Sequence, residues 1–364
     1  MTLLSILMFS LLSFLTGAAE TGAPQGADLL FVGDAMQHQG QLDRARQLAG
    51  GKGYDYSECF RLIAPEITAA DYAVCNLEVP LGGGPDYSGY PCFSAPDSYA
   101  AALKDAGFDM FLTANNHCLD RRDKGACNTL TALDRLGVDH TGTFHDAADR
   151  AAKVPFIKDI NGIKTGFLAY TYGTNGIEPR DGVEVSLIDR NKMAEEIAAT
   201  RKAGAEIVVV AMHWGVEYVL LPGEVQKSLA KFLVDQGVDL IIGGHPHVIQ
   251  PMEVVHNDKE DKDVLLVYSL GNFISNMKTG DTRGGALVKA RIERGADGKA
   301  RFKSAVYDTF FSQKPDGERG NYRVVPSARA DEIPAAQKAH WHIFNNAARR
   351  IFDTHNVNVP PARP

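Results

Sequence analysis

The sequence predicts an α/β fold built on an open sheet whose strands are covered on both faces. Six short apolar segments alternate with amphipathic helix candidates along the chain. Continuous apolar runs are typical of strands that are buried on both faces, and alternation of strands and helices is typical of open α/β sheets. With 364 residues and 45% apolar content, the chain can bury a large core, and we expect one elaborated domain.

The predicted elements follow one another in a regular order. The strand candidates are residues 28–32, 71–75, 108–113, 206–212, 238–242 and 264–268, with a further strand over 163–170. The helix candidates are residues 98–106, 125–136, 189–203, 224–236 and 335–352. Residues 286–292 and 301–306 alternate between apolar and polar, which predicts a hairpin with one face in water. The Pro-rich tail from Pro360 is expected to fray.

The N-terminal segment predicts export. Residues 2–15 form an apolar and hydroxyl run, and Gly17 and Ala19 occupy the −3 and −1 places of a signal-peptidase site. We therefore expect a signal peptide over 1–19 and a periplasmic or extracellular protein; the alternatives are an uncleaved membrane anchor and a misassigned start.

The five cysteines show no C-x-x-C spacing and leave any disulfide pairing open. The net charge of −7, with no basic stripe, argues against nucleic acid as a partner.

Polar side chains follow each of the six strand candidates at the point where the strand ends. Asp34, Glu78, Asn116, His213, His245 and His247 are the potential metal ligands among them. Because ligands bind at the carboxyl ends of strands in open α/β sheets, we expect these side chains to meet at one edge. Imidazole, carboxylate and amide oxygen suit Mn, Zn, Fe or Mg ions, and six groups exceed one tetrahedral site. The sequence therefore predicts two divalent ions about 3.5–4 Å apart that stabilise an anionic transition state.

Six motifs in this order resemble the CapA family, which is associated with poly-γ-glutamate capsule synthesis and is similar to calcineurin-like metallophosphatases. They are Gly33-Asp34, Asn76-Leu77-Glu78, Asn115-Asn116-His117, His213 to Glu217, Gly244 to His247 and Ser269 to Phe273. The resemblance implies a metallophosphatase-like α/β/β/α sandwich of two mixed sheets flanked by helices. It places this domain at 28–325, with 326–364 as a C-terminal helix and tail packed on it.

The resemblance also implies how the ligands divide between two ions. Asp34, Glu78 and His247 would hold one ion. Glu78, Asn116, His213 and His245 would hold the other, so Glu78 would bridge. The chain departs from the phosphatase pattern at Asp34-Ala35-Met36, where those enzymes have Asp-x-His, and a His follows only at His38. The bridging position is Glu rather than Asp.

Other residues near the motifs are candidates for catalysis or substrate binding. By the resemblance, His117 would donate a proton or stabilise negative charge beside the substrate. Glu217 is a candidate general base, or a residue that orients His213. Arg121 and Arg122 would bind a carboxylate or phosphate, unless they form a solvated basic turn. Asn272 is a further candidate for substrate binding.

Two more expectations concern the surroundings of these residues. Asp120 is expected to cap a helix. Residues 82–93, rich in Gly and Pro, are expected to form a long mobile loop over the site.

These observations support two hypotheses about function. The first is an exported metal-dependent hydrolase that acts on an anionic cell-envelope polymer, poly-γ-glutamate or a related one. The second is a non-catalytic accessory subunit that uses the same cleft to hold a growing polymer for a membrane-bound capsule synthase. The metal ligand set favours the first hypothesis, and the missing Asp-x-His favours the second.

Overall fold

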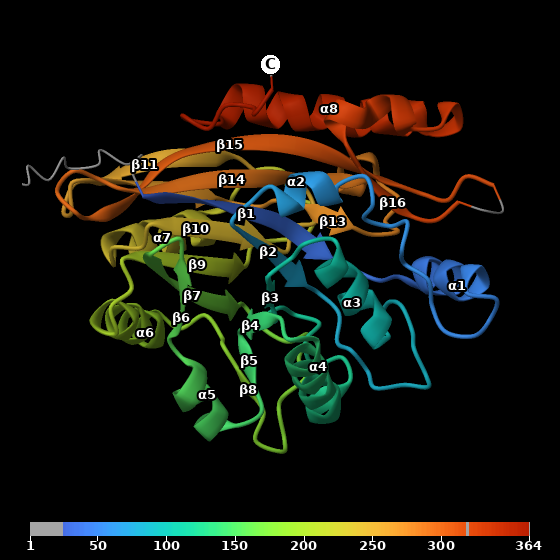
Figure 1. Ribbon diagram of the computed structural model, residues 1–364, viewed down its shortest axis with the longest axis horizontal. Coiled ribbons are helices and arrows are strands. Elements are labelled where there is room, and N and C mark those ends of the chain that lie inside the picture. Colours follow the sequence, from blue (N-terminus) through green and yellow to red (C-terminus); the bar gives the residue numbers. More distant parts are fainter. Residues whose placement is uncertain (1–24, 318–319, 364) are drawn as a thin grey trace, which may run out of the picture.

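The apolar runs of the sequence form the central strands of two mixed sheets that pack face to face (Figure 1). The computed structural model describes residues 25–317 and 320–363, so the predicted signal peptide lies outside the described residues. The first sheet has a parallel half and an antiparallel half, whereas in the second sheet an antiparallel strand at each edge flanks a parallel centre.

The first sheet has the order β16-β15-β14-β1-β2-β3-β4, with β13 paired to β1. Its strands are β1 (Gly26–Ala35), β2 (Tyr72–Leu77), β3 (Met110–Leu112), β4 (Asp139–Thr141), β13 (Asn272–Ile274), β14 (Gly284–Arg294), β15 (Ala300–Gln313) and β16 (Arg323–Pro326). The predicted hairpin is confirmed, because β14 and β15 pair antiparallel along their length. β1 runs further than predicted and includes Asp34, which pairs in register with Asn76 of β2 and Asn272 of β13.

The second sheet has the order β11-β12-β10-β9-β7-β6. Its strands are β6 (Phe156–Ile160), β7 (Ile163–Thr171), β9 (Ile207–His213), β10 (Leu240–Gly244), β11 (Met252–Asn257) and β12 (Lys262–Val267). β5 (Thr143–Phe144) and β8 (Glu184–Val185) form a separate two-stranded ladder.

Helices cover the outer face of each sheet. Their bounds are α1 (Gln39–Leu48), α2 (Ala64–Thr68), α3 (Asp97–Asp105), α4 (Arg122–Leu136), α5 (Ala147–Lys153), α6 (Arg190–Lys202), α7 (Glu224–Asp235) and α8 (Ala335–His355). Side chains of α1 to α4 pack on the first sheet, and those of α6 and α7 pack on the second. The predicted α/β/β/α sandwich of two mixed sheets flanked by helices is therefore confirmed. Among the described residues, no helix has the length and apolar character needed to cross a membrane.

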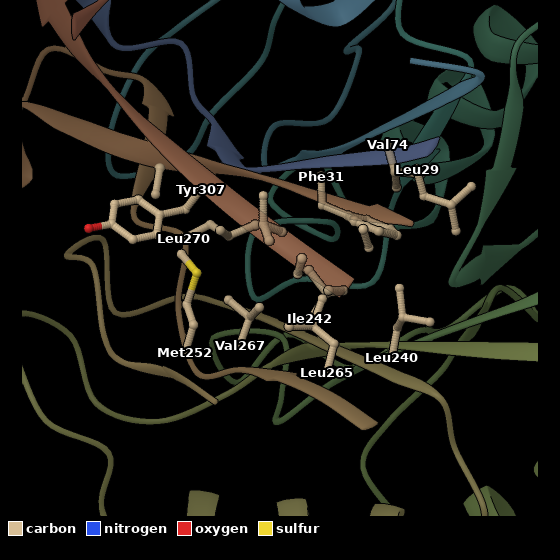
Figure 2. Packing of buried hydrophobic residues seen from close by; sticks show 14 of the residues in the cluster. Leu29, Phe31, Val74, Leu240, Ile242, Met252, Leu265, Val267, Leu270 and Tyr307 are labelled. Carbon is tan, nitrogen blue, oxygen red and sulfur yellow. The ribbon is translucent and has the colours of Figure 1, made fainter. Parts of the chain in front are cut away.

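The main core lies between the two sheets (Figure 2). Phe31 and Val74 of the first sheet point toward Leu240, Ile242 and Leu265 of the second, and all five are at most 4% exposed. Burying each such side chain contributes about 1.5–3 kcal/mol. Because alternate residues of a strand face opposite sides, β1 also sends Leu30 and Val32 into the helix-covered outer layer. This two-sided burial explains the continuous apolar runs.

The C-terminal helix and the tail that follows it both pack on β15. α8 packs on β15, where the rings of Phe352 and Tyr307 have centroids 4.4 Å apart. The predicted fraying of the tail is wrong. The amide of Tyr307 donates to the carbonyl of Pro360 at 3.1 Å, and the amide of Ala362 donates to the carbonyl of Tyr307 at 2.7 Å. β16 pairs only with the last residues of β15, which leaves this edge open for the tail.

Candidate metal centre

The predicted ligands meet between the two sheets at the carboxyl ends of their parallel strands. Asp34 lies near the end of β1, Glu78 follows β2, and Asn116 follows β3. On the facing sheet, His213 ends β9 and the His245–His247 turn follows β10. All six predicted ligands are at most 4% exposed.

The ligand atoms form two overlapping groups that share Glu78. Asp34, Glu78 and His247 form one group, and Glu78, His213 and His245 form the other, with the potential ligand atoms in each group within 4.8 Å of one another. His213 Nε2 lies 2.8 Å from Asn116 Oδ1 and 3.4 Å from Glu78 Oε1, so Asn116 belongs to the second group. These are the same groups that the resemblance implied.

The backbone around the two histidines is fitted closely to the first sheet. A Cβ on Gly244 would lie 2.8 Å from Asp34 Oδ1, so a side chain there would displace the carboxylate. His245 and His247 have φ values of 97° and 57°, a region that non-glycine residues seldom adopt. Strained backbone of this kind clusters at functional sites, where the surrounding structure holds it in place.

The donor set fits divalent cations. Glu78 Oε1 and His245 Nδ1 are buried without a hydrogen-bond partner. Buried polar atoms are nearly always paired, because an unpaired one costs the free energy of its lost hydration. Both atoms belong to the two ligand groups, and a cation between these groups would pair them. Imidazole, carboxylate and amide donors suit Mn, Zn, Fe or Mg ions.

Burial and mutual charge shift the pKa values of these groups in different directions. Burial lowers the pKa of His213 and of His245 to about 3, so both rings are neutral at neutral pH. Burial opposes protonation of His247 too, but the charges of Glu78 and Asp34 and the hydrogen bond to Asp34 raise its pKa to about 9. Burial and the neighbouring charge of Asp34 raise the pKa of Glu78 well above its ordinary value.

Protonation of His247 predicts proton release when an ion binds to its group. A ligand must be deprotonated, so an ion at Asp34, Glu78 and His247 displaces the His247 proton at neutral pH, whereas His213 and His245 have none to lose. We expect binding of one ion to tighten as the pH rises toward about 9, the His247 pKa. Calorimetry with Zn²⁺ in buffers of different ionisation enthalpy measures the protons released.

The matching variant is His247→Ala, which should bind one ion fewer and release fewer protons. Full binding of two ions by the variant, or the same proton release as in the native protein, would contradict the assignment of His247 to one ion.

His117 lies beside this centre and is held by Asp120. His117 Nδ1 is 2.8 Å from Asp120 Oδ2, which also accepts the amide hydrogen of Phe93 at 2.8 Å. The prediction that Asp120 caps a helix is wrong, because α4 begins only at Arg122 and the carboxylate is directed to the imidazole. Burial would lower the pKa of His117, but the hydrogen bond to Asp120 and the charge of Glu78 raise it above the ordinary value.

Two predicted substrate-binding residues are committed to other contacts. Asn272 is fully buried: its Oδ1 lies 3.1 Å from His247 Nδ1, and its amide donates to the carbonyl of Thr282 at 3.0 Å. It orients His247 and has no polar atom to offer a substrate. Arg121 donates to the carbonyls of Phe93 and Cys92 and to the Ser88 hydroxyl, so it fastens the 82–93 loop.

The remaining candidates lie at the margin. Arg122 is exposed at the start of α4, and its side chain forms no hydrogen bond or ion pair with another described residue. Glu217 follows His213, and its charge opposes the effect of burial on the pKa of His245 and adds to the raised pKa of His247. The prediction that Glu217 orients His213 is wrong, because the two ring nitrogens of His213 face Asn116 and Asn76.

Sequence reasoning missed two asparagines that support the ligands. Asn76 Nδ2 lies 2.8 Å from Asp34 Oδ1 and 3.4 Å from His213 Nδ1. Asn175, on the loop after β7, accepts from Asn116 Nδ2 at 3.3 Å and lies 3.4 Å from His117 Nδ1. Asn76 stands in the motif Asn76-Leu77-Glu78, so its place at a strand end indicates a residue of the site. Asn175 lies in no such motif.

The departure from the Asp-x-His pattern is visible in the structure. Met36 is buried in the helix-covered layer, and His38 Nδ1 faces Gln41 and the amide of Asn276 instead of the ligand groups. Burial lowers the pKa of His38 to about 4. His38 therefore does not supply the missing imidazole.

Fold and site together define an α/β sandwich protein with a candidate metal centre at the edge shared by two sheets. The chain belongs to the family described as bacterial capsule synthesis protein PGA_cap, whose model matches residues 28–277. The predicted membership of the CapA family is thereby confirmed. The chain is 30% identical over 274 residues to the capsule biosynthesis protein CapA of Bacillus anthracis, an alignment that covers 72% of this chain and 63% of that protein.

Two further similarities complete the comparison. The PGA biosynthesis protein CapA of Bacillus subtilis is 29% identical over 273 residues, which is 74% of this chain and 68% of that protein. The chain thus spans about two thirds of these relatives. The solved NAD nucleotidase of Haemophilus influenzae has a TM-score of 0.49 and 10% identity, covering 88% of this chain and 62% of that one.

Proposed function

We propose that this protein is an exported metal-dependent hydrolase that acts on an anionic cell-envelope polymer, poly-γ-glutamate or a related one, through two divalent ions. The observation that carries the proposal is the pair of ligand groups sharing Glu78, with two of their buried polar atoms unpaired. Membership of the capsule synthesis family supports a polymer as the substrate.

The residues of the chain have separate roles in this proposal. The two ligand groups that share Glu78 would hold divalent ions, which when bound would supply Lewis acidity and activate a water. Asp120 holds the Nδ1 proton of His117, which leaves Nε2 as the nitrogen that donates a proton to the leaving group. Asn272 fixes the ring of His247, and Asn76 fixes Asp34. Such supporting contacts orient metal ligands and tune their basicity.

Metal analysis beside two hydrolysis assays tests the proposal. Purified protein should contain divalent metal and should cleave bis(p-nitrophenyl) phosphate or poly-γ-glutamate, and a chelator should abolish the cleavage. Protein that binds no metal, or whose activity survives chelation, would exclude a metal-dependent hydrolase.

A second candidate is an accessory subunit that holds the polymer for a membrane-bound synthase without cleaving it. The observation that favours it is Met36, which stands where the phosphatase pattern has a histidine. Binding of poly-γ-glutamate without cleavage of either substrate would support this candidate.

Export is a separate proposal, supported by the apolar run and the small residues before Glu20. N-terminal sequencing of the protein from the culture medium or periplasm should begin at Glu20. A sequence that begins at Met1 would argue against cleavage.

A further inference from the structure

A buried arginine without a carboxylate partner lies near the candidate metal centre. Arg283 follows the 3-10 turn η1 (Gly280–Thr282) and is 4% exposed. A charged side chain is seldom this buried unless an opposite charge pairs with it. In the part of the chain that the structure describes, its guanidinium forms no ion pair with an Asp or Glu, and its Nε is buried without a hydrogen-bond partner. Arg283 therefore carries a positive charge that no described residue neutralises.

Neutral groups hold this guanidinium in place. Its Nη2 donates to the carbonyl of Ser312 at 3.4 Å and to Oε1 of Gln337 at 3.0 Å. The guanidinium carbon also lies 4.7 Å from the centre of the Phe311 ring. These contacts position the positive charge, and none of them cancels it. An arginine held in this way is suited to binding a carboxylate or a phosphate.

Gln337 joins this arginine to a lysine. The backbone amide of Lys314, the residue after β15, donates to Oε1 of Gln337 at 3.0 Å, and the Lys314 carbonyl accepts from Nε2 of Gln337 at 2.7 Å. The same Oε1 accepts from Arg283. One glutamine side chain of α8 therefore fixes the backbone of Lys314 beside the guanidinium of Arg283.

Lys278 brings a third positive charge from the loop before η1, where it is exposed. Burial and the charges of Arg283 and Lys278 lower the pKa of Lys314, so the three cations lie close enough to repel one another. Within residues 25–317 and 320–363, neither lysine forms an ion pair, and Asp281 of η1 pairs with none of the three cations. We call Lys278, Arg283 and Lys314 the cationic cluster.

The segment that carries Lys278 and Arg283 starts at the metal centre. Oδ1 of Asn272, the first residue of β13, lies 3.1 Å from His247 Nδ1. The side-chain amide of Asn272 donates to the carbonyl of Thr282, the residue before Arg283, at 3.0 Å. Asn272 thus contacts a potential metal ligand on one side and the turn that precedes Arg283 on the other.

His38 lies within electrostatic range of both regions. The ring of Phe93 is edge-on to those of His117 and His38, with centroid distances of 4.7 and 5.4 Å. The backbone amide of Asn276, in the segment that carries the cluster, donates to His38 Nδ1 at 3.3 Å. Burial lowers the pKa of His38, and the charges of the histidines at the centre and of Lys314 lower it further. The cationic cluster therefore adjoins the metal centre on the side of α1.

A polymer with a carboxylate on every unit needs cations beyond the metal ions. Among the described residues, no Lys or Arg side chain forms a hydrogen bond or ion pair with the six predicted ligands. Arg121 holds the 82–93 loop through Ser88 and the carbonyls of Cys92 and Phe93, so the expectation of a mobile loop gives way to a fastened one. The cationic cluster supplies positive charge that the centre itself lacks.

We propose that the cationic cluster is a subsite for a carboxylate of the polymer, on a unit further along the chain from the unit that the metal centre holds. This inference rests on the proposed function and extends its substrate site from the ligand groups to Arg283, Lys314 and Lys278. Guanidinium and ammonium groups bind carboxylates and phosphates alike, and the polyglutamate of the proposed function makes the carboxylate the expected occupant.

Calorimetry on the metal-loaded protein with two probes tests the subsite. A γ-glutamyl hexamer spans several units, whereas methylphosphonate is a small anion for the metal centre alone. His117→Ala is the background of every measurement, because it should slow cleavage of the hexamer. Lys314→Gln should weaken hexamer binding about tenfold, the scale of one charge-assisted hydrogen bond, and the exposed Lys278→Gln about threefold. Neither should change the affinity for methylphosphonate.

Two controls accompany these variants. Lys202→Gln, at the exposed end of α6, removes the same charge away from the site and should change neither affinity. A γ-linked hexamer with carboxamides in place of its free carboxylates should bind the native cluster and Lys314→Gln equally. Arg283→Gln should weaken hexamer binding at least as much as Lys314→Gln. If its thermal unfolding shows that the buried substitution disrupts the fold, the two lysine variants decide.

The outcomes separate this inference from the proposed function. Unchanged hexamer affinity in Lys314→Gln, or no binding of the hexamer, overturns the subsite even if the protein hydrolyses a phosphodiester. Equal loss of affinity for both probes also overturns it, because the substitution would then act on the metal centre. Inorganic phosphate that displaces the hexamer at equal concentration overturns it and assigns the cluster to phosphate. The predicted losses in a protein that cleaves nothing support the subsite and contradict the hydrolase.

Discussion

Glu78→Gln is expected to remove both metal ions and to reduce hydrolysis by about a thousandfold or more. Glu78 is shared by the two ligand groups, so its carboxylate is the one ligand that both ions would lose together. Bound metals supply several kcal/mol of transition-state stabilisation, and each 1.36 kcal/mol is a factor of ten in rate. Metal analysis after gel filtration and a phosphodiester assay measure the two losses.

The same substitution should have opposite effects on stability with and without metal. Without metal, the pKa of Glu78 is raised well above its ordinary value, so the fold favours the protonated carboxyl group. This group therefore stabilises the fold at low pH, and the stabilisation is lost as the pH rises through the raised pKa. Metal-free Glu78→Gln should therefore unfold at a higher temperature than the metal-free native protein at neutral pH.

With metal, the order should reverse. A bound ion adds about 2.7 kcal/mol to the free energy of unfolding when its concentration is about a hundredfold above Kd. The variant should gain little of this stabilisation. Glu253→Gln is the control, because burial raises the pKa of Glu253 as well but the residue lies on β11, outside the ligand groups. Two ions retained by Glu78→Gln would refute the bridging role.

The convergence of the ligands could be predicted because it depends on local patterns. Apolar runs identify strands that are buried on both faces, and the residue that follows each run is thereby placed at one end of a sheet. Asp34, Glu78, His213 and His245 reach the same edge for this reason. The spacing of apolar residues did not indicate that two sheets share this edge. The resemblance to the CapA family did.

The supporting contacts could not be predicted, because they depend on distances between loops that are remote in sequence. Asn272 looks like a polar strand-end residue available to a substrate, yet pairing of β13 with β1 buries it against His247. Asp120 has the spacing of a helix cap. Its carboxylate instead accepts the amide hydrogen of Phe93, from the 82–93 loop, and contacts the imidazole of His117. Sequence patterns give the order of elements, but not which loop crosses another.

His117→Ala is expected to lower kcat by about 10²–10⁴-fold, the usual contribution of a positioned general acid. His117 lies outside both ligand groups, so the variant should keep its metal content and its affinity for methylphosphonate. This combination separates proton donation from metal binding. A variant that loses metal along with activity would place His117 among the ligands instead.

The pH dependence gives the sharper test of the same role, through Asp120→Asn. Burial lowers the pKa of His117, and the hydrogen bond to Asp120 and the charge of Glu78 more than reverse that effect. A general acid works only while protonated, so activity should persist below the His117 pKa and fall as the pH rises through it. Loss of the Asp120 charge lowers that pKa, and the alkaline limb of kcat should therefore move to lower pH. An unchanged limb would mean that another group donates the proton, because the amide oxygen introduced by the substitution could still accept the hydrogen bond from Phe93 and preserve the local structure.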